Sequence, residues 1–117
     1  MEQGNAAAAF TLEDLARTIA RRAASGASAS YTAKLAGEGV ATCARKFGEE
    51  ALETVIASLQ GDREGLKGEA ADVLYHLLVL LHVAGVPFAS VTAELGRRTG
   101  RTGLEEKAAR GTPGDRA

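Results

Sequence analysis

The fold is decided by residues 40–84, VATCARKFGEEALETVIASLQGDREGLKGEAADVLYHLLVLLHVA. Over residues 40–60, apolar side chains recur every three or four positions, which at about 100° per residue places them on one side of an α-helix. They are Val40, Ala44, Phe47, Ala51, Val55 and Leu59. Gly61 can end this helix and Asp62 can cap the next one. The connection is short, so we expect two antiparallel helices that pack against each other.

The second helix of this pair is predicted over residues 63–84, with Gly85 as its stop. Beyond Val73 it is apolar almost all round, which is typical of a helix covered by neighbours on several sides. Tyr75, His76 and His82 interrupt this apolar run, and it is shorter than the roughly 20 residues that a membrane span needs. We therefore expect a buried helix and no membrane partner.

Two more helices are predicted outside this pair. Thr11 is a suitable N-cap for a helix from Leu12 to about Ala24, and Pro87 can begin a last helix that ends near Arg98. Residues 30–35 favour one or two helical turns inside the connector between the first helix and the long pair. No strand-like alternation is visible.

The predicted fold is therefore all-α, a four-helix bundle-type domain of antiparallel helices over residues 11–98. Residues 1–10 are expected to be a flexible leader, and residues 99–117 a mobile polar tail. A chain of 117 residues buries a modest share of its surface, so we expect dimerisation to complete the bundle.

The composition limits the function classes. A formal net charge of -1 provides no broad basic field, so nucleic acid is not an expected partner. The opening residues do not resemble a secretory signal, which predicts a cytoplasmic protein. Cys43, the single cysteine, lies in an apolar helical pattern and is expected to be a core residue rather than a nucleophile.

Carboxylates on the two long helices carry the functional prediction. The first helix has Glu49, Glu50 and Glu53 within an arc of about 100°, and the second has Glu69 and Asp72 in an arc of about 60° that includes His76. If the helices are antiparallel neighbours, Glu50 and Glu53 can face Glu69 and Asp72. Four like charges that close must take up protons or bind cations, and hard divalent ions such as Mg²⁺ or Mn²⁺ suit carboxylate oxygens.

Such a cluster repels a free polyphosphate and attracts one that carries a metal ion, which indicates phosphoryl chemistry. The predicted phosphate contacts are Lys34, Arg45 and Lys46, and the polar residues Ser30, Tyr31 and Thr32 are available for a ligand. Tyr75 can stack on a base or serve as a structural tyrosine. His76 can belong to the core, support a ligand or bind one itself.

The segments Ser30-Tyr31-Thr32-Ala33, residues 46–53 (KFGEEALE) and residues 69–81 (EAADVLYHLLVLL) resemble phosphoribosyl-ATP pyrophosphatases in order and spacing. That family belongs to the all-α, MazG-like pyrophosphatases. The resemblance covers residues 12–98 and implies Mg²⁺-dependent hydrolysis of phosphoribosyl-ATP to phosphoribosyl-AMP and pyrophosphate, the second step of histidine biosynthesis, by a homodimer. It also implies metal ligands at Glu50, Glu53, Glu69 and Asp72, and a further acid at Glu49 that binds metal or activates water.

Three alternatives remain open at this point. A housekeeping nucleoside-triphosphate pyrophosphatase of the same MazG-like type would use the same metal chemistry. A non-catalytic helical adaptor would carry the acids as a surface patch. A di-iron bundle would need Glu-x-x-His pairs. Asp72 and Glu53 stand where the histidines of those pairs would be expected, which argues against the di-iron bundle.

Overall fold

The computed structural model describes residues 9–26, 28 and 30–100. These residues form five helices, and no strand occurs among them. The helices are α1 (Leu12–Ala23), α2 (Tyr31–Gly37), α3 (Val40–Leu59), α4 (Arg63–Ala84) and α5 (Phe88–Thr99). The all-α prediction is confirmed, and the expected turns in the connector are a complete helix, α2. The predicted leader and tail lie almost wholly outside the described residues.

The helix ends follow from local chemistry. Thr11 and Asp14 form a reciprocal capping box at the start of α1, with each side chain 3.0 Å from the other residue's backbone nitrogen. Asp62 caps α4 by accepting from the Gly65 N–H at 2.9 Å. Gly61 and Gly85 have positive φ angles of 71° and 79°, a conformation that glycine adopts without strain. The predicted bounds of the four main helices are therefore correct to within one residue.

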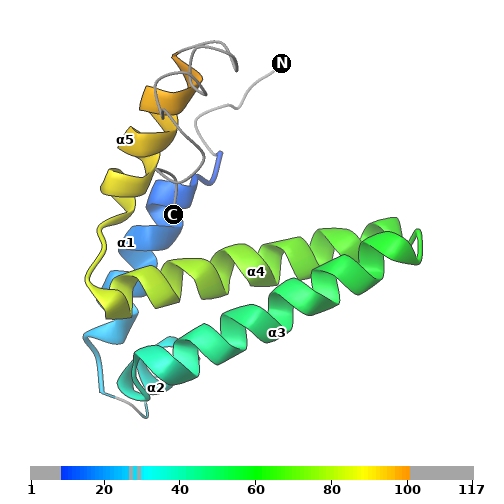
Figure 1. The fold of residues 1–117 in the computed structure, drawn as a ribbon. Coiled ribbons are helices and arrows are strands. Elements are labelled where there is room, and N and C mark those ends of the chain that lie inside the picture. Colours follow the sequence, from blue (N-terminus) through cyan, green and yellow to red (C-terminus); the bar gives the residue numbers. More distant parts are fainter. Residues whose placement is uncertain (1–8, 27, 29, 101–117) are drawn as a thin grey trace.

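The helices are arranged as two pairs joined at one corner (Figure 1). The long helices α3 and α4 lie side by side and antiparallel, connected by the turn at Gly61 and Asp62. The shorter α1 and α5 extend away from the C-terminal end of α4, and α2 packs against α1, α3 and α4 near that corner. The far half of the α3–α4 pair is consequently covered by neither α1 nor α5.

The hydrophobic core lies at the corner where the pairs meet. Four helices contribute its fully buried side chains, which are Ile19, Leu35, Cys43, Leu78 and Val79. The predicted burial of the second half of α4 is confirmed, since Leu78 is 3% exposed and Val79 is completely buried. Cys43 lies in this core as expected, and its Sγ contacts the Leu35 carbonyl oxygen at 3.4 Å.

One part of the predicted core is wrong for the single chain. The apolar face expected to be buried on α3 is largely open, with Val55 51% and Leu59 82% exposed. Phe47 and Ala51 of the predicted face are half-buried, as is Glu50, while the buried positions of α3 are Cys43 and Ala57. The reason is that α4 covers only one side of α3, and that side includes Glu50.

Within the described residues, no single helix is long and apolar enough to cross a membrane. Helices α4 and α5 meet the length and composition criteria only when taken together, and they are bent by 113° relative to each other.

Candidate active site

Three carboxylates meet between the two long helices. One oxygen from each of Glu50, Glu69 and Asp72 lies within 4.8 Å of the other two. Glu69 and Asp72 project together because they are three residues apart on α4, and Glu50 reaches them from the side of α3 that faces α4. Glu50 and Glu69 are half-buried and Asp72 is exposed, so the cluster opens to solvent on one side.

Glu69 is the electrostatic centre of this cluster. Its Oε1 is buried and has no hydrogen-bond partner within the part of the chain that the structure describes. Burial raises the pKa of the Glu69 carboxyl, and the neighbouring charges of Glu53, Asp72 and Glu50 raise it further. A buried acceptor without a donor, surrounded by like charge, requires either a proton or a cation. The donor set is made only of carboxylates, so it fits a hard divalent ion.

Glu53 lies next to this cluster but is not one of the three converging acids. Its charge acts on Glu69, so the two side chains are neighbours. Together with Glu69, Gln60 and Asp62 it borders a hollow of about 210 Å³ at the free end of the α3–α4 pair. The structure thus brings three of the four predicted ligands together and places the fourth beside Glu69.

Glu49 lies on a different part of α3 and is half-exposed. Its carboxylate accepts a hydrogen bond from Arg45 at 3.1 Å and lies 3.7 Å from the Lys46 Nζ. The two cations predicted to contact phosphate are therefore paired with an acid in this structure. Exposed pairs of this kind are weak, so a polyanion could compete for both cations.

Lys34 and Ser30, two more predicted ligand contacts, have local partners. The Lys34 Nζ donates to Glu38 at 2.9 Å one turn further along the chain. The Ser30 hydroxyl oxygen accepts from the Ala33 N–H at 3.0 Å and caps α2. The cap explains why a serine at this position serves the fold whether or not it touches a ligand.

The remaining predicted contacts form what we call the three-ring cluster, the side chains of Tyr31, Tyr75 and His76. Ring centroids of the two tyrosines are 6.3 Å apart with planes inclined by 26°, and His76 stands nearly perpendicular to Tyr75 at 5.0 Å. The Tyr75 hydroxyl lies 2.6 Å from the Thr32 Oγ1. Burial is the main cause of the raised pKa of Tyr75. Thr32 and His76 are buried. The position of His76 in the core is one of the alternatives that the sequence left open.

Sequence reasoning missed one residue near this cluster. The positive charge of Arg22, in the last turn of α1, acts on the Tyr75 hydroxyl and opposes the rise of its pKa. The only sequence signal was the Arg21-Arg22 pair, which is also common at helix C-termini because cations are favoured there. Its proximity to α4 depends on tertiary packing.

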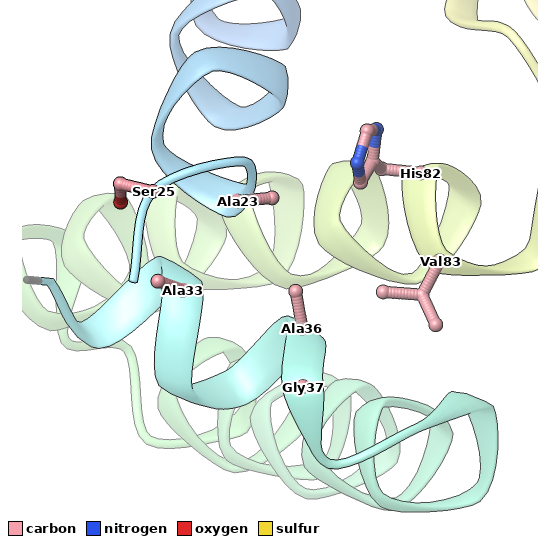
Figure 2. Close-up of a pocket in the computed structure, with 7 residues that line it drawn as sticks. All are labelled: Ala23, Ser25, Ala33, Ala36, Gly37, His82 and Val83. Atoms are coloured by element: carbon pink, nitrogen blue, oxygen red, sulfur yellow. The ribbon is translucent and has the colours of Figure 1, made fainter. Parts of the chain in front are cut away.

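A second hollow, of about 470 Å³, lies where α1, α2 and α4 meet (Figure 2). Its lining consists mainly of small side chains, namely Ala23, Ser25, Ala33, Ala36, Gly37, His82 and Val83. None of the predicted site residues borders it. His82, to which the sequence assigned no role, is exposed at its edge. This hollow is lined by neither an acid nor a permanent cation.

These features define a class of protein, an all-helical domain whose central antiparallel pair holds a cluster of carboxylates suited to divalent cations. Within that class, the chain belongs to the phosphoribosyl-ATP pyrophosphohydrolase family, whose model matches residues 12–99. The resemblance drawn from the sequence is thereby confirmed.

Individual relatives cover nearly the whole chain. A phosphoribosyl-ATP pyrophosphatase from Agrobacterium fabrum is 59% identical over 105 residues, which is 90% of this chain and 98% of that protein. Proteins of the same name from Methylobacterium radiotolerans and Rhizorhabdus wittichii are 58% and 60% identical over 87% and 86% of this chain, and 95% and 94% of their own lengths. The matched segments therefore span both long helices.

Proposed function

We propose that this protein hydrolyses phosphoribosyl-ATP to phosphoribosyl-AMP and pyrophosphate, the second step of histidine biosynthesis. One water is consumed, the bond between the α- and β-phosphates breaks, and a proton is released. Family membership and the names of the relatives support the substrate. The observation that carries the chemistry is the convergence of Glu50, Glu69 and Asp72 within 4.8 Å.

We further propose that the acids hold Mg²⁺, with Mn²⁺ as a substitute. Glu50, Glu69 and Asp72 would bind the ion, with Glu53 as a further ligand beside Glu69. When bound, a divalent ion neutralises the charge on carboxylates and phosphate oxygens and lowers the pKa of a coordinated water. The unpartnered Oε1 of Glu69 supports this proposal, because a cation would supply the partner that it lacks.

The surrounding residues have distinct proposed roles. Glu49, whose carboxylate contacts Arg45 and Lys46, is the further acid that binds metal or accepts the proton that the attacking water loses. Arg45 and Lys46 exchange their contacts with Glu49 for phosphate oxygens when substrate binds. Lys34 and the polar side chains at the start of α2 contact the rest of the substrate.

The test is a turnover assay of pyrophosphate release with matched substrates. Phosphoribosyl-ATP is compared with ATP and GTP at equal concentration in Mg²⁺ and in excess chelator. We expect turnover of phosphoribosyl-ATP alone, and only with the metal. Comparable rates with ordinary nucleoside triphosphates would favour the housekeeping pyrophosphatase, and metal-independent turnover would contradict the role given to the acids.

A homodimer is the proposed assembly, because α3 presents an apolar stripe to solvent. The stripe consists of Leu52, Val55, Ile56 and Leu59, which are between 45% and 82% exposed and follow helical spacing. Mass measurement in solution should give twice the 12.1 kDa of the chain. Leu59→Glu should shift the mass toward the monomer, whereas Leu95→Glu, on an exposed leucine of α5, should leave it unchanged. A cytoplasmic location, with neither nucleic acid nor membrane as a partner, stays a prediction.

A further inference from the structure

Tyr31 differs from its neighbours in the three-ring cluster because its ring is accessible. Its side chain is 52% exposed, whereas Tyr75 is half-buried and His76 is 6% exposed. The Tyr75 ring lies near-parallel to that of Tyr31 at 6.3 Å, and the Tyr75 hydroxyl is bonded to Thr32. Tyr31 is therefore the aromatic side chain of this cluster that a ligand can reach from solvent.

The hydrogen bonds of His76 determine what Tyr31 can offer to that ligand. The His76 Nδ1 lies 2.8 Å from the Asp72 carbonyl oxygen, which only accepts, so Nδ1 carries the proton. In the neutral ring Nε2 is then an acceptor, and the Tyr31 hydroxyl, 3.4 Å away, donates to it. Because the hydroxyl proton is directed at His76 and Tyr75 is stacked against the ring, Tyr31 offers a ligand the remaining, exposed part of its aromatic surface.

The same hydrogen bonds fix the ring relative to the acids. His76 follows Asp72 by one helical turn, about 5.4 Å along α4. The chain of contacts from the Tyr31 hydroxyl through His76 to the Asp72 backbone thus ties the ring to the helix that carries two of the converging carboxylates. In a nucleotide, one sugar separates the base from the first phosphate. An aromatic ring whose hydroxyl contacts a histidine one turn from Asp72 is therefore placed to receive a base while the acids engage phosphates.

We propose that the exposed face of Tyr31 binds the purine base of the substrate by stacking, and that His76 is a positioning residue that fixes this ring. The inference rests on the proposed function, since it assumes a nucleotide at the carboxylate cluster. It assigns recognition of the base to α2 and of the phosphates to α3 and α4. Stacking on aromatic rings tolerates different bases, so this contact provides affinity more than base specificity.

A metal-free binding experiment tests the stacking directly. The chain has no tryptophan, so Tyr31→Trp introduces a single tryptophan, which can be excited selectively, at the proposed contact. In excess chelator, AMP should quench this probe saturably, whereas ribose 5-phosphate, which lacks the base, should not. Phe10→Trp, at an aromatic side chain that is 69% exposed and remote from the cluster in sequence, controls for collisional quenching. Equal quenching by AMP in both variants would overturn the proposal.

Kinetics with phosphoribosyl-ATP provide a second, independent test. Tyr31→Leu should raise KM by about 5- to 150-fold, the range for loss of one stacking contact, with little change in kcat. Tyr31→Phe, which keeps the ring but loses the hydroxyl contact with His76, should restore part of the binding. Mn²⁺ affinity should be the same in both variants. An unchanged KM in Tyr31→Leu, or an equal loss in Tyr31→Phe, would overturn the stacking. A wild-type protein without turnover would instead contradict the proposed function, and the quenching experiment would still decide whether Tyr31 binds a base.

Discussion

The two halves of α4 pack against the same neighbour, α3, yet the first half carries acids of the candidate site and the second half carries the hydrophobic core. The first half holds Glu69, whose Oε1 has no hydrogen-bond partner among the described residues, and the exposed Asp72. The second half holds Leu78 and Val79 at the centre of the core. Like charges held together reduce stability, whereas buried apolar side chains increase it. The core half of the helix therefore offsets the cost of the like charges that the acid half holds together.

The largest expected effect is the loss of activity in Asp72→Asn, which removes a charge from the acid half. Metal-assisted charge stabilisation is worth several kcal/mol, so kcat/KM should fall by about 100-fold or more. The melting temperature should stay the same or rise, because like-charge repulsion decreases. Glu64→Gln is the matched control, since Glu64 is an exposed acid in the same half that pairs with Lys67. Full activity in Asp72→Asn would contradict the site.

Next in size is the effect of Leu78→Ala in the core half. Removing a fully buried leucine should lower the free energy of unfolding by about 2 to 5 kcal/mol, as measured by chemical denaturation. Leu74→Ala, on the same helix at a side chain that is 39% exposed, should lower it by less. If both variants lost the same free energy, burial at the corner of the fold would not be what makes Leu78 stabilising.

A smaller effect is expected at the beginning of the acid half. Asp62→Ala removes the side chain that caps α4 through the Gly65 N–H and should lower the free energy of unfolding by about 1 kcal/mol. Asp62→Asn, which retains a capping oxygen, should recover most of this loss. Denaturant titrations of the three proteins check this. Equal free energies of unfolding for wild type and Asp62→Ala would show that other contacts hold the turn.

The smallest expected effect is the pH dependence contributed by Glu69. Because the folded-state pKa of Glu69 is raised above that of the unfolded chain, its contribution to stability is fully present below the unfolded-chain pKa. It is lost as pH rises through the folded-state pKa. In metal-free protein, the melting temperature of wild type relative to Glu69→Gln should therefore decline as pH increases from about 4, near the ordinary glutamate pKa. A melting-temperature difference that stays constant with pH would show that folding does not raise the pKa of Glu69.

The sequence predicted most of the fold because helix ends depend on local contacts. Thr11, Asp62 and Gly85 act within a few residues of their position, so their effect can be recognised in the chain itself. The proximity of Glu69 and Asp72 was likewise predictable, because they share a helix face.

Contacts between distant residues could not be predicted in this way. Thr32 and Tyr75 are 43 positions apart, and their hydrogen bond depends on how α2 packs against α4. Which acids of α3 lie beside Glu69 likewise depends on how α3 is rotated against α4. The open face of α3 was missed because hydrophobic periodicity identifies an apolar side without indicating what covers it.

The tight turn at Gly61 and Asp62 also has a kinetic consequence. The helices that it joins carry every acid of the candidate site, so the residues that must meet are close along the chain. Closing so short a loop loses little entropy, and contacts of low sequence separation form rapidly. We therefore expect the carboxylates to be brought together early in folding, before α1 docks. Repulsion between them should slow this step, and divalent ions in the refolding buffer should increase its rate.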